Sequence, residues 1–200
     1  MTQASFPDDQ AKKKKNRIIS IWDGVFASFN IGCGETHVSA FIILFQATNL
    51  QVGLLASLPN LIASLFQLKT PACVEKVGSR KKIIVLSVML QLMMWFPIIA
   101  IAFTGWERHS VPFLILFYSL YSTFGSFLAP AWGSLMSESV AEKERGRYFG
   151  LRGKIGGMVT VLSGFGAGYL LYTLQCPVYQ RFALVFLMMG QGIGARVDKQ

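Results

Sequence analysis

This 200-residue chain has few charged residues and few cysteines. Charged side chains make up only 14% of it, against about 25% in a typical soluble domain. Its three cysteines, Cys33, Cys73 and Cys176, are not placed to pair and lack the spacing of metal ligands. We therefore expect no metal and no cofactor. What is present is apolar sequence, which accounts for 52% of the residues.

Long apolar segments occur six times along the chain, and a bilayer core needs about 20 apolar residues per helix. They cover residues 18–45, 52–68, 83–103, 111–136, 155–174 and 182–195. We predict an all-α integral membrane protein with a six-transmembrane-helix bundle at 18–195. A basic cytoplasmic segment, 1–17, precedes it, and a cytoplasmic end, 196–200, follows. The sixth segment has only 14 residues and contains three glycines, so we expect a short or truncated last helix and a fragment of a longer protein.

Positive charge is distributed unevenly between alternate loops. Seventeen of the 19 Lys and Arg residues lie before the first apolar segment or after the second, fourth and sixth, and only Arg108 and Arg181 lie in the other loops. Short loops rich in Lys and Arg stay in the cytoplasm. We predict a multi-pass protein of the plasma (inner) membrane with both termini cytoplasmic. Lipid headgroups explain the net charge of +9 better than nucleic acid does.

Several predicted spans contain polar residues, which are costly in a bilayer and usually face a bundle interior or a watery cavity. The candidates for lining such a cavity are Asn30, Glu35, His37, Asn60, Ser64, Tyr118, Tyr121 and Ser122. Glu35 and His37 diverge by about 200° on an ideal helix, so we do not expect them to pair unless Gly32 and Gly34 unwind the turn. The alternative is that these residues only form hydrogen bonds between helices.

The fifth apolar segment is rich in glycine at helical spacing. Gly153 and Gly157 are four residues apart, as are Gly164 and Gly168. Small residues at this spacing allow two membrane helices to approach closely. We predict that these four glycines pack against a neighbouring helix.

Two loops resemble signature sequences of the major facilitator superfamily. The loop after the second segment reads PACVEKVGSRKK, in which Glu75, Gly78 and Arg80 fit the family pattern, although Pro71 replaces a glycine and Glu75 an aspartate. The loop after the fourth segment fits with Pro130, Glu138, Arg145, Gly146 and Gly150. The resemblance covers residues 18–195 and corresponds to the amino-terminal six-helix half of a twelve-helix transporter.

The resemblance implies a secondary active transporter that moves a small solute by alternating access, with or without a coupling ion. It implies a conformational latch formed by Glu75, Gly78, Arg80, Glu138 and Arg145; the alternative is a solvated loop that only sets topology. A second six-helix half or a second copy would complete the site.

A different function is a six-helix scaffold or receptor-like subunit without transport activity. We do not expect an enzyme, because no nucleophile, metal-ligand set or pair of carboxylates accompanies Glu35 and His37. The sequence does not specify the substrate, the ion or the direction of transport.

Overall fold

The computed structural model of this protein describes residues 7–104, 110–128, 130, 132–133, 140 and 142–197. Regular secondary structure in these ranges is entirely helical. The helices are α1 (Pro7–Asn30), η1 (Ile31–Glu35), α2 (Thr36–Ile43), α3 (Asn49–Gln67), α4 (Thr70–Val77), α5 (Arg80–Thr104), α6 (Ser110–Ser126), α8 (Glu142–Thr173) and α9 (Val178–Val197). The predicted all-α class is confirmed.

The first three helices follow one another without a break, and the short η1 between α1 and α2 has π-helical geometry. Asn30 and Thr36, which flank η1, keep helical backbone angles. Gly32 and Gly34 lie within its five residues, and glycine is a weak former of α-helix. A π segment changes the helical phase of the residues that follow it and is frequent at functional sites.

Local sequence signals set the bounds of α3 and α4. Before α3, the Gln51 N–H donates to Thr48 Oγ1 at 3.3 Å and the Thr48 N–H donates to Gln51 Oε1 at 2.9 Å, which together form a capping box. Gly78 ends α4 with φ of 66°, a left-handed conformation that favours glycine. Its N–H donates to the Val74 carbonyl at 2.9 Å. The chain therefore turns between α4 and α5.

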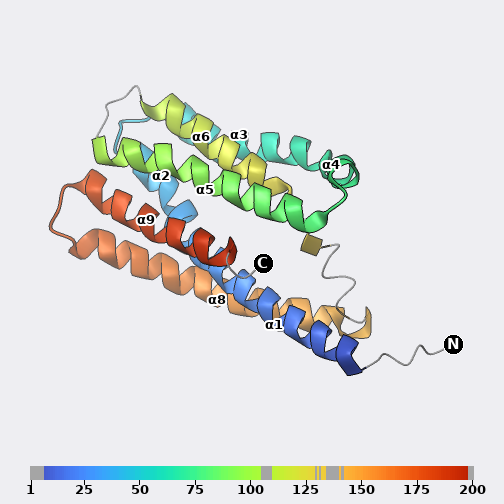
Figure 1. Ribbon diagram of the computed structural model, residues 1–200. Helices are drawn as coiled ribbons and strands as arrows, with labels where there is room; N and C mark the ends of the chain where they lie inside the picture. The colour runs from blue at the N-terminus through green and yellow to red at the C-terminus, as the bar shows by residue number, and fades with distance from the viewer. Residues whose placement is uncertain are drawn as a thin grey trace.

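The longer helices form two groups (Figure 1). In one, α6 packs against α3 and α5; in the other, α1 and η1 pack against α8 and α9, and α5 joins the groups through α9. Exchanging α1–η1 for α6, α3 for α8 and α5 for α9 reproduces the contacts of α1–η1, those of α6 and the contact between α5 and α9. The contact between α8 and α9 has no counterpart of similar extent between α3 and α5. The shared part of this pattern is that of two related three-helix repeats, whose sequence symmetry is weak in many transporters.

An aromatic cluster forms the centre of the core. The Phe186 ring of α9 lies 5.0 Å from Trp95 of α5 and 5.2 Å from Phe41 of α2. All three side chains are fully buried. Helix α9 is therefore a central packing element, although its apolar segment is short.

Within the described residues, three helices are long and apolar enough to cross a membrane: Asn49–Gln67, Lys82–Thr104 and Glu144–Thr173. The predicted count of six transmembrane helices is therefore not confirmed. The first predicted span is divided into α1, η1 and α2, and the fourth corresponds to α6, which has 17 residues.

The predicted short last helix needs correction. Helix α9 has 20 residues and begins at Val178, four residues before the predicted segment. Its part with described side chains, Val178–Met188, is apolar. Its first turn forms at Pro177, whose carbonyl accepts hydrogen bonds from the N–H groups of Gln180 and Arg181. The glycine-rich residues 190–194 continue the helix instead of ending it.

Candidate functional site

A carboxylate contact joins the first and fourth predicted spans inside the bundle. The hydroxyl of Tyr121, on α6, donates a hydrogen bond of 2.7 Å to Oε1 of Glu35, the last residue of η1. Tyr121 is buried, packs edge-on against Trp95 with ring centroids 5.5 Å apart, and stacks on Tyr118 at 5.8 Å. The structure thus brings three predicted cavity residues together, Glu35, Tyr118 and Tyr121.

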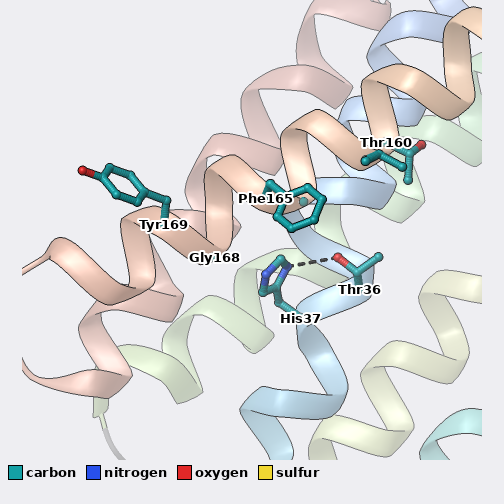
Figure 2. A pocket seen from close by; sticks show the side chains of 8 residues that line it. Thr36, His37, Thr160, Phe165, Gly168 and Tyr169 are labelled. Atoms are coloured by element: carbon teal, nitrogen blue, oxygen red, sulfur yellow. Dashed lines mark hydrogen bonds between the residues drawn. The ribbon is translucent and has the colours of Figure 1, made fainter.

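His37 lies on a different side of the same helical run and faces α8. Its Nδ1 is 3.0 Å from Oγ1 of Thr36, and that hydroxyl is 2.6 Å from the Gly32 carbonyl oxygen (Figure 2). A Cβ added to Gly168 of α8 would lie 3.9 Å from His37 Nε2. Glu35 and His37 therefore have separate partners, Tyr121 and Thr36, as their divergence on the helix predicts.

An open pocket of about 640 Å³ lies between the α2 end of this run and α8. Its lining residues are Thr36, His37, Thr160, Val161, Gly164, Phe165, Gly168 and Tyr169 (Figure 2). Its volume is in the range of small-molecule sites, about 300–1,000 Å³. His37 is the only predicted cavity residue among them, and the sequence argument did not identify Phe165 or Tyr169.

The other predicted cavity residues lie apart from these two places. Asn30 is buried, and its Oδ1 has no hydrogen-bond partner among the described residues. Asn60 and Ser64 are exposed on α3 and donate to carbonyls of their own helix, Ala56 and Leu61, each at 2.9 Å. Ser122 is half-buried on α6.

A seam of small residues joins the first span to α8. A Cβ at Gly32 would lie 2.3 Å from the Thr160 carbonyl oxygen, so the two backbones are in direct contact. Further along the seam, the Thr160 hydroxyl donates to the Ser28 carbonyl at 3.2 Å, and a Cβ at Gly156 would lie 2.7 Å from Ser28 Oγ. The four-residue spacing of Gly24, Ser28 and Gly32 is the sequence signal that could have revealed this side of the seam.

The four glycines predicted to pack differ in their surroundings. A Cβ at Gly164 would lie 3.5 Å from the Gly32 carbonyl oxygen, and one at Gly168 would approach His37. A Cβ at Gly153 or Gly157 would have no heavy atom within 4 Å. Helix packing at Gly153 and Gly157 stays a prediction about a neighbour outside this structure.

The predicted latch residues are only partly described. Glu75 is exposed on α4, Gly78 ends that helix, and Arg80 begins α5. The side chain of Arg80 and the whole of Glu138 lie outside the described residues. The Arg145 Nε donates to the Val140 carbonyl at 3.2 Å. The latch therefore stays a prediction.

Charged contacts between α1 and α8 were not predicted from the sequence. Arg17 and Glu144 form an ion pair of 2.9 Å. Arg152 lies 3.8 Å from Oδ2 of the buried Asp23, and its Nε donates to the Ser20 carbonyl at 3.2 Å. These contacts hold the charged part of α8 against the first helix.

The guanidinium of Arg152 has a third contact, because its Cζ lies 4.1 Å above the ring of Trp132. This is the geometry of a cation–π interaction. Trp132 lies between α6 and α8 in the chain, so Arg152 links α1, α8 and the residues after α6.

Metal ligands do not cluster in the described part of the chain, which contains no group of three His, Cys, Asp or Glu side chains positioned to hold an ion. The chemistry that the site offers is hydrogen bonding: one carboxylate with a phenol donor, and one imidazole in a pocket that Phe165 and Tyr169 also line.

The fold and these contacts define a helical membrane protein with ionisable groups inside its bundle. Residues 24–194 match the family described as Major Facilitator Superfamily. The chain belongs to this family, whose members are membrane transporters of small-molecule substrates and not enzymes, and the resemblance seen in its loops is confirmed. Comparisons with curated proteins and with solved structures returned no match.

Proposed function

We propose that this protein forms a six-helix, amino-terminal half of a secondary active transporter that moves a small solute by alternating access. The α1–η1–α2 run and helices α3, α5, α6, α8 and α9 are the six spans of this proposal. Both termini lie in the cytoplasm, beneath the plasma (inner) membrane. Membership of a transporter family supports the activity, and the two related groups of helices support the half-transporter architecture.

The contact between Glu35 and Tyr121 is the observation that carries the proposal. A carboxyl group inside a membrane bundle is costly to place there and commonly marks a proton or solute pathway. Here it joins η1 to α6 by a single side-chain hydrogen bond of 2.7 Å. A proton on Glu35, or a solute group that replaces the Tyr121 hydroxyl, would weaken this bond and allow the two helices to separate. Alternating access requires a contact of this breakable kind.

The exposed helices support a partner in the membrane. Only 11% of the apolar span of α3 and 17% of that of α8 are buried, compared with 33% for α5. The open side of α3 carries the polar Asn60 and Ser64, and that of α8 carries Gly153 and Gly157. Polar groups exposed to hydrocarbon are unfavourable. A second six-helix half or a second copy of this chain covers these faces in our proposal.

The alternative is a scaffold or receptor-like subunit. One observation favours it: Ser57, Asn60 and Ser64 all donate hydrogen bonds to the backbone of their own helix. Side chains bonded in this way need no solute, and they leave α3 suited to packing against another protein.

Proton-coupled flux distinguishes the two functions. The purified protein is reconstituted in liposomes, at densities that allow two copies to associate, with a pH-sensitive dye inside. A panel of small solutes is then added. We expect at least one solute to change the internal pH, and Glu35→Gln to reduce that rate at least tenfold. Glu142→Gln is the matched control, because Glu142 is an exposed carboxylate in the first turn of α8.

Each other outcome is informative. Solute-driven proton flux that persists in Glu35→Gln would remove Glu35 from the coupling mechanism. Saturable binding of a solute without flux in any preparation would contradict transport and favour the receptor-like subunit.

A further inference from the structure

We propose that the pocket between α2 and α8 binds a small, uncharged aromatic molecule that carries one O–H or N–H donor, such as a phenol or an indole. The inference rests on the proposed function, because it names the class of solute that such a transporter would take. It is carried by the hydrogen bonds of His37 and by the side chains that share the pocket with it.

The hydrogen bonds of Thr36 determine which nitrogen of His37 carries the proton. Oγ1 of Thr36 lies 2.6 Å from the carbonyl oxygen of Gly32. Two oxygens this close require a proton between them, and the carbonyl has none to give. The single hydroxyl proton of Thr36 therefore points at Gly32.

The direction of the Thr36 hydroxyl proton determines the tautomer of the His37 imidazole. Because Thr36 Oγ1 has already used its proton, it only accepts from His37 Nδ1, which is 3.0 Å away. Nδ1 therefore carries the ring proton, and the Nε2 of the neutral imidazole is an acceptor. Nε2 is the ring nitrogen closest to Gly168, one of the residues that line the pocket (Figure 2). The pocket thus presents a hydrogen-bond acceptor to whatever enters it.

The rest of the lining selects an aromatic and uncharged body. Phe165 and Tyr169 lie one helical turn apart on α8, and both rings are largely exposed, at 76% and 69%. Aromatic rings stack favourably on such side chains. None of the eight described lining residues is Lys, Arg, Asp or Glu, so a charged ligand would lose its hydration without gaining a counter-ion.

Two glycines provide the space for this ligand. Gly164 and Gly168 also line the pocket, and the Cβ position of Gly168 is already 3.9 Å from His37 Nε2. A larger side chain at residue 168 would extend into the space beside Nε2. The same position therefore limits both the size of the ligand and its access to the acceptor.

A pair of probes tests the inference on the unaltered protein. 1-Naphthol has a hydroxyl donor, and 1-methoxynaphthalene has the same ring system without it. Binding is measured by fluorescence titration of the purified protein in lipid nanodiscs, with empty nanodiscs as the reference for partition into lipid. We expect 1-naphthol to bind about 3- to 10-fold more tightly, which corresponds to one net hydrogen bond.

Substitutions then assign the difference to His37. His37→Phe keeps a ring but removes the acceptor, and we expect it to abolish the preference for 1-naphthol. His37→Gln keeps an acceptor and should retain part of it. Thr173→Ala is the control, since Thr173 is exposed on α8, does not line the pocket, and donates only to carbonyls of its own helix.

Equal affinity of the two probes for the unaltered protein would overturn the inference, as would a preference that survives His37→Phe. The comparison of the two probes uses the unaltered protein, so the inference can be tested even if a variant fails to fold. The proposed function can fail independently of this inference. Binding of 1-naphthol through His37 without any solute flux would contradict transport and support the proposed ligand class of the pocket. Flux of other solutes together with equal binding of the two probes would contradict only the proposed ligand class.

Discussion

Substituting Gly32 by alanine tests the contact between η1 and α8. The added Cβ would lie 2.0 Å from Ser163 Oγ and 2.3 Å from the Thr160 carbonyl oxygen. The Ser163 hydroxyl can rotate away, but the Thr160 oxygen belongs to the backbone, so α8 itself must move. Overpacking typically costs about 1–3 kcal/mol. A Cβ 2.3 Å from a backbone oxygen belongs to the upper part of that range, about 2–3 kcal/mol, and the better helix propensity of alanine offsets about 1 kcal/mol of it. We expect a net loss in the free energy of unfolding of about 1–2 kcal/mol.

Cys33 reports this loss directly. Its side chain is buried, and its Sγ lies 3.6 Å from the Ser163 carbonyl oxygen across the same contact. With Cys73 and Cys176 replaced by serine, Cys33 is the only thiol left. A loss of 1–2 kcal/mol predicts that Gly32→Ala raises its labelling rate by about 5- to 30-fold if labelling requires the contact to open.

Gly157→Ala is the matched control, because a Cβ there has no heavy atom within 4 Å. It should leave Cys33 labelling unchanged and stabilise α8 by up to about 1 kcal/mol. Wild-type labelling and an unchanged unfolding temperature in Gly32→Ala would refute the close backbone contact between η1 and α8.

Two further predictions concern topology and the charged contacts of α8. In intact cells, a membrane-impermeant thiol reagent should label Cys176 and not Cys73, since the charge distribution predicts that they lie on opposite sides of the membrane. Labelling of Cys73 with Cys176 protected would contradict the predicted orientation. Arg152→Lys keeps the charge but loses the planar guanidinium above Trp132 and its Nε donor. We expect the free energy of unfolding to fall by about 1–2 kcal/mol, measured by thermal unfolding of the purified protein. Equal stability of the two proteins would show that only the charge of Arg152 matters.

The sequence predicted the features that depend on short stretches of chain. Apolar segments of about 20 residues are candidates for membrane helices, and three helices of the described residues meet that criterion. The loop motifs around Glu75 and Arg145 pointed to the family that residues 24–194 match. The skew of Lys and Arg gave an orientation, which stays a prediction. In the structure, the amino-terminal end of α1 and helix α4 lie at one end of the molecule, and the α8–α9 connection lies at the other (Figure 1).

Which face of each helix meets a neighbour was decided by the tertiary structure. Two sets of glycines run along α8, and the sequence gives no reason to prefer one. Packing placed Gly156 and Gly164 against the first span and left Gly153 and Gly157 open. The choice depends on the rotation of α8 about its own axis, and only the neighbouring helix fixes that rotation.

The pairing of Glu35 with Tyr121 has the same origin. The two residues are 86 positions apart, and no local pattern links them. The π segment at Ile31–Glu35 also changes the phase of the helix, so spacing counted through it does not give the faces on which Asn30 and His37 lie. Composition and periodicity determined that this chain forms membrane helices; the contacts between helices determined which polar groups meet, because those contacts set the rotation and register of each helix.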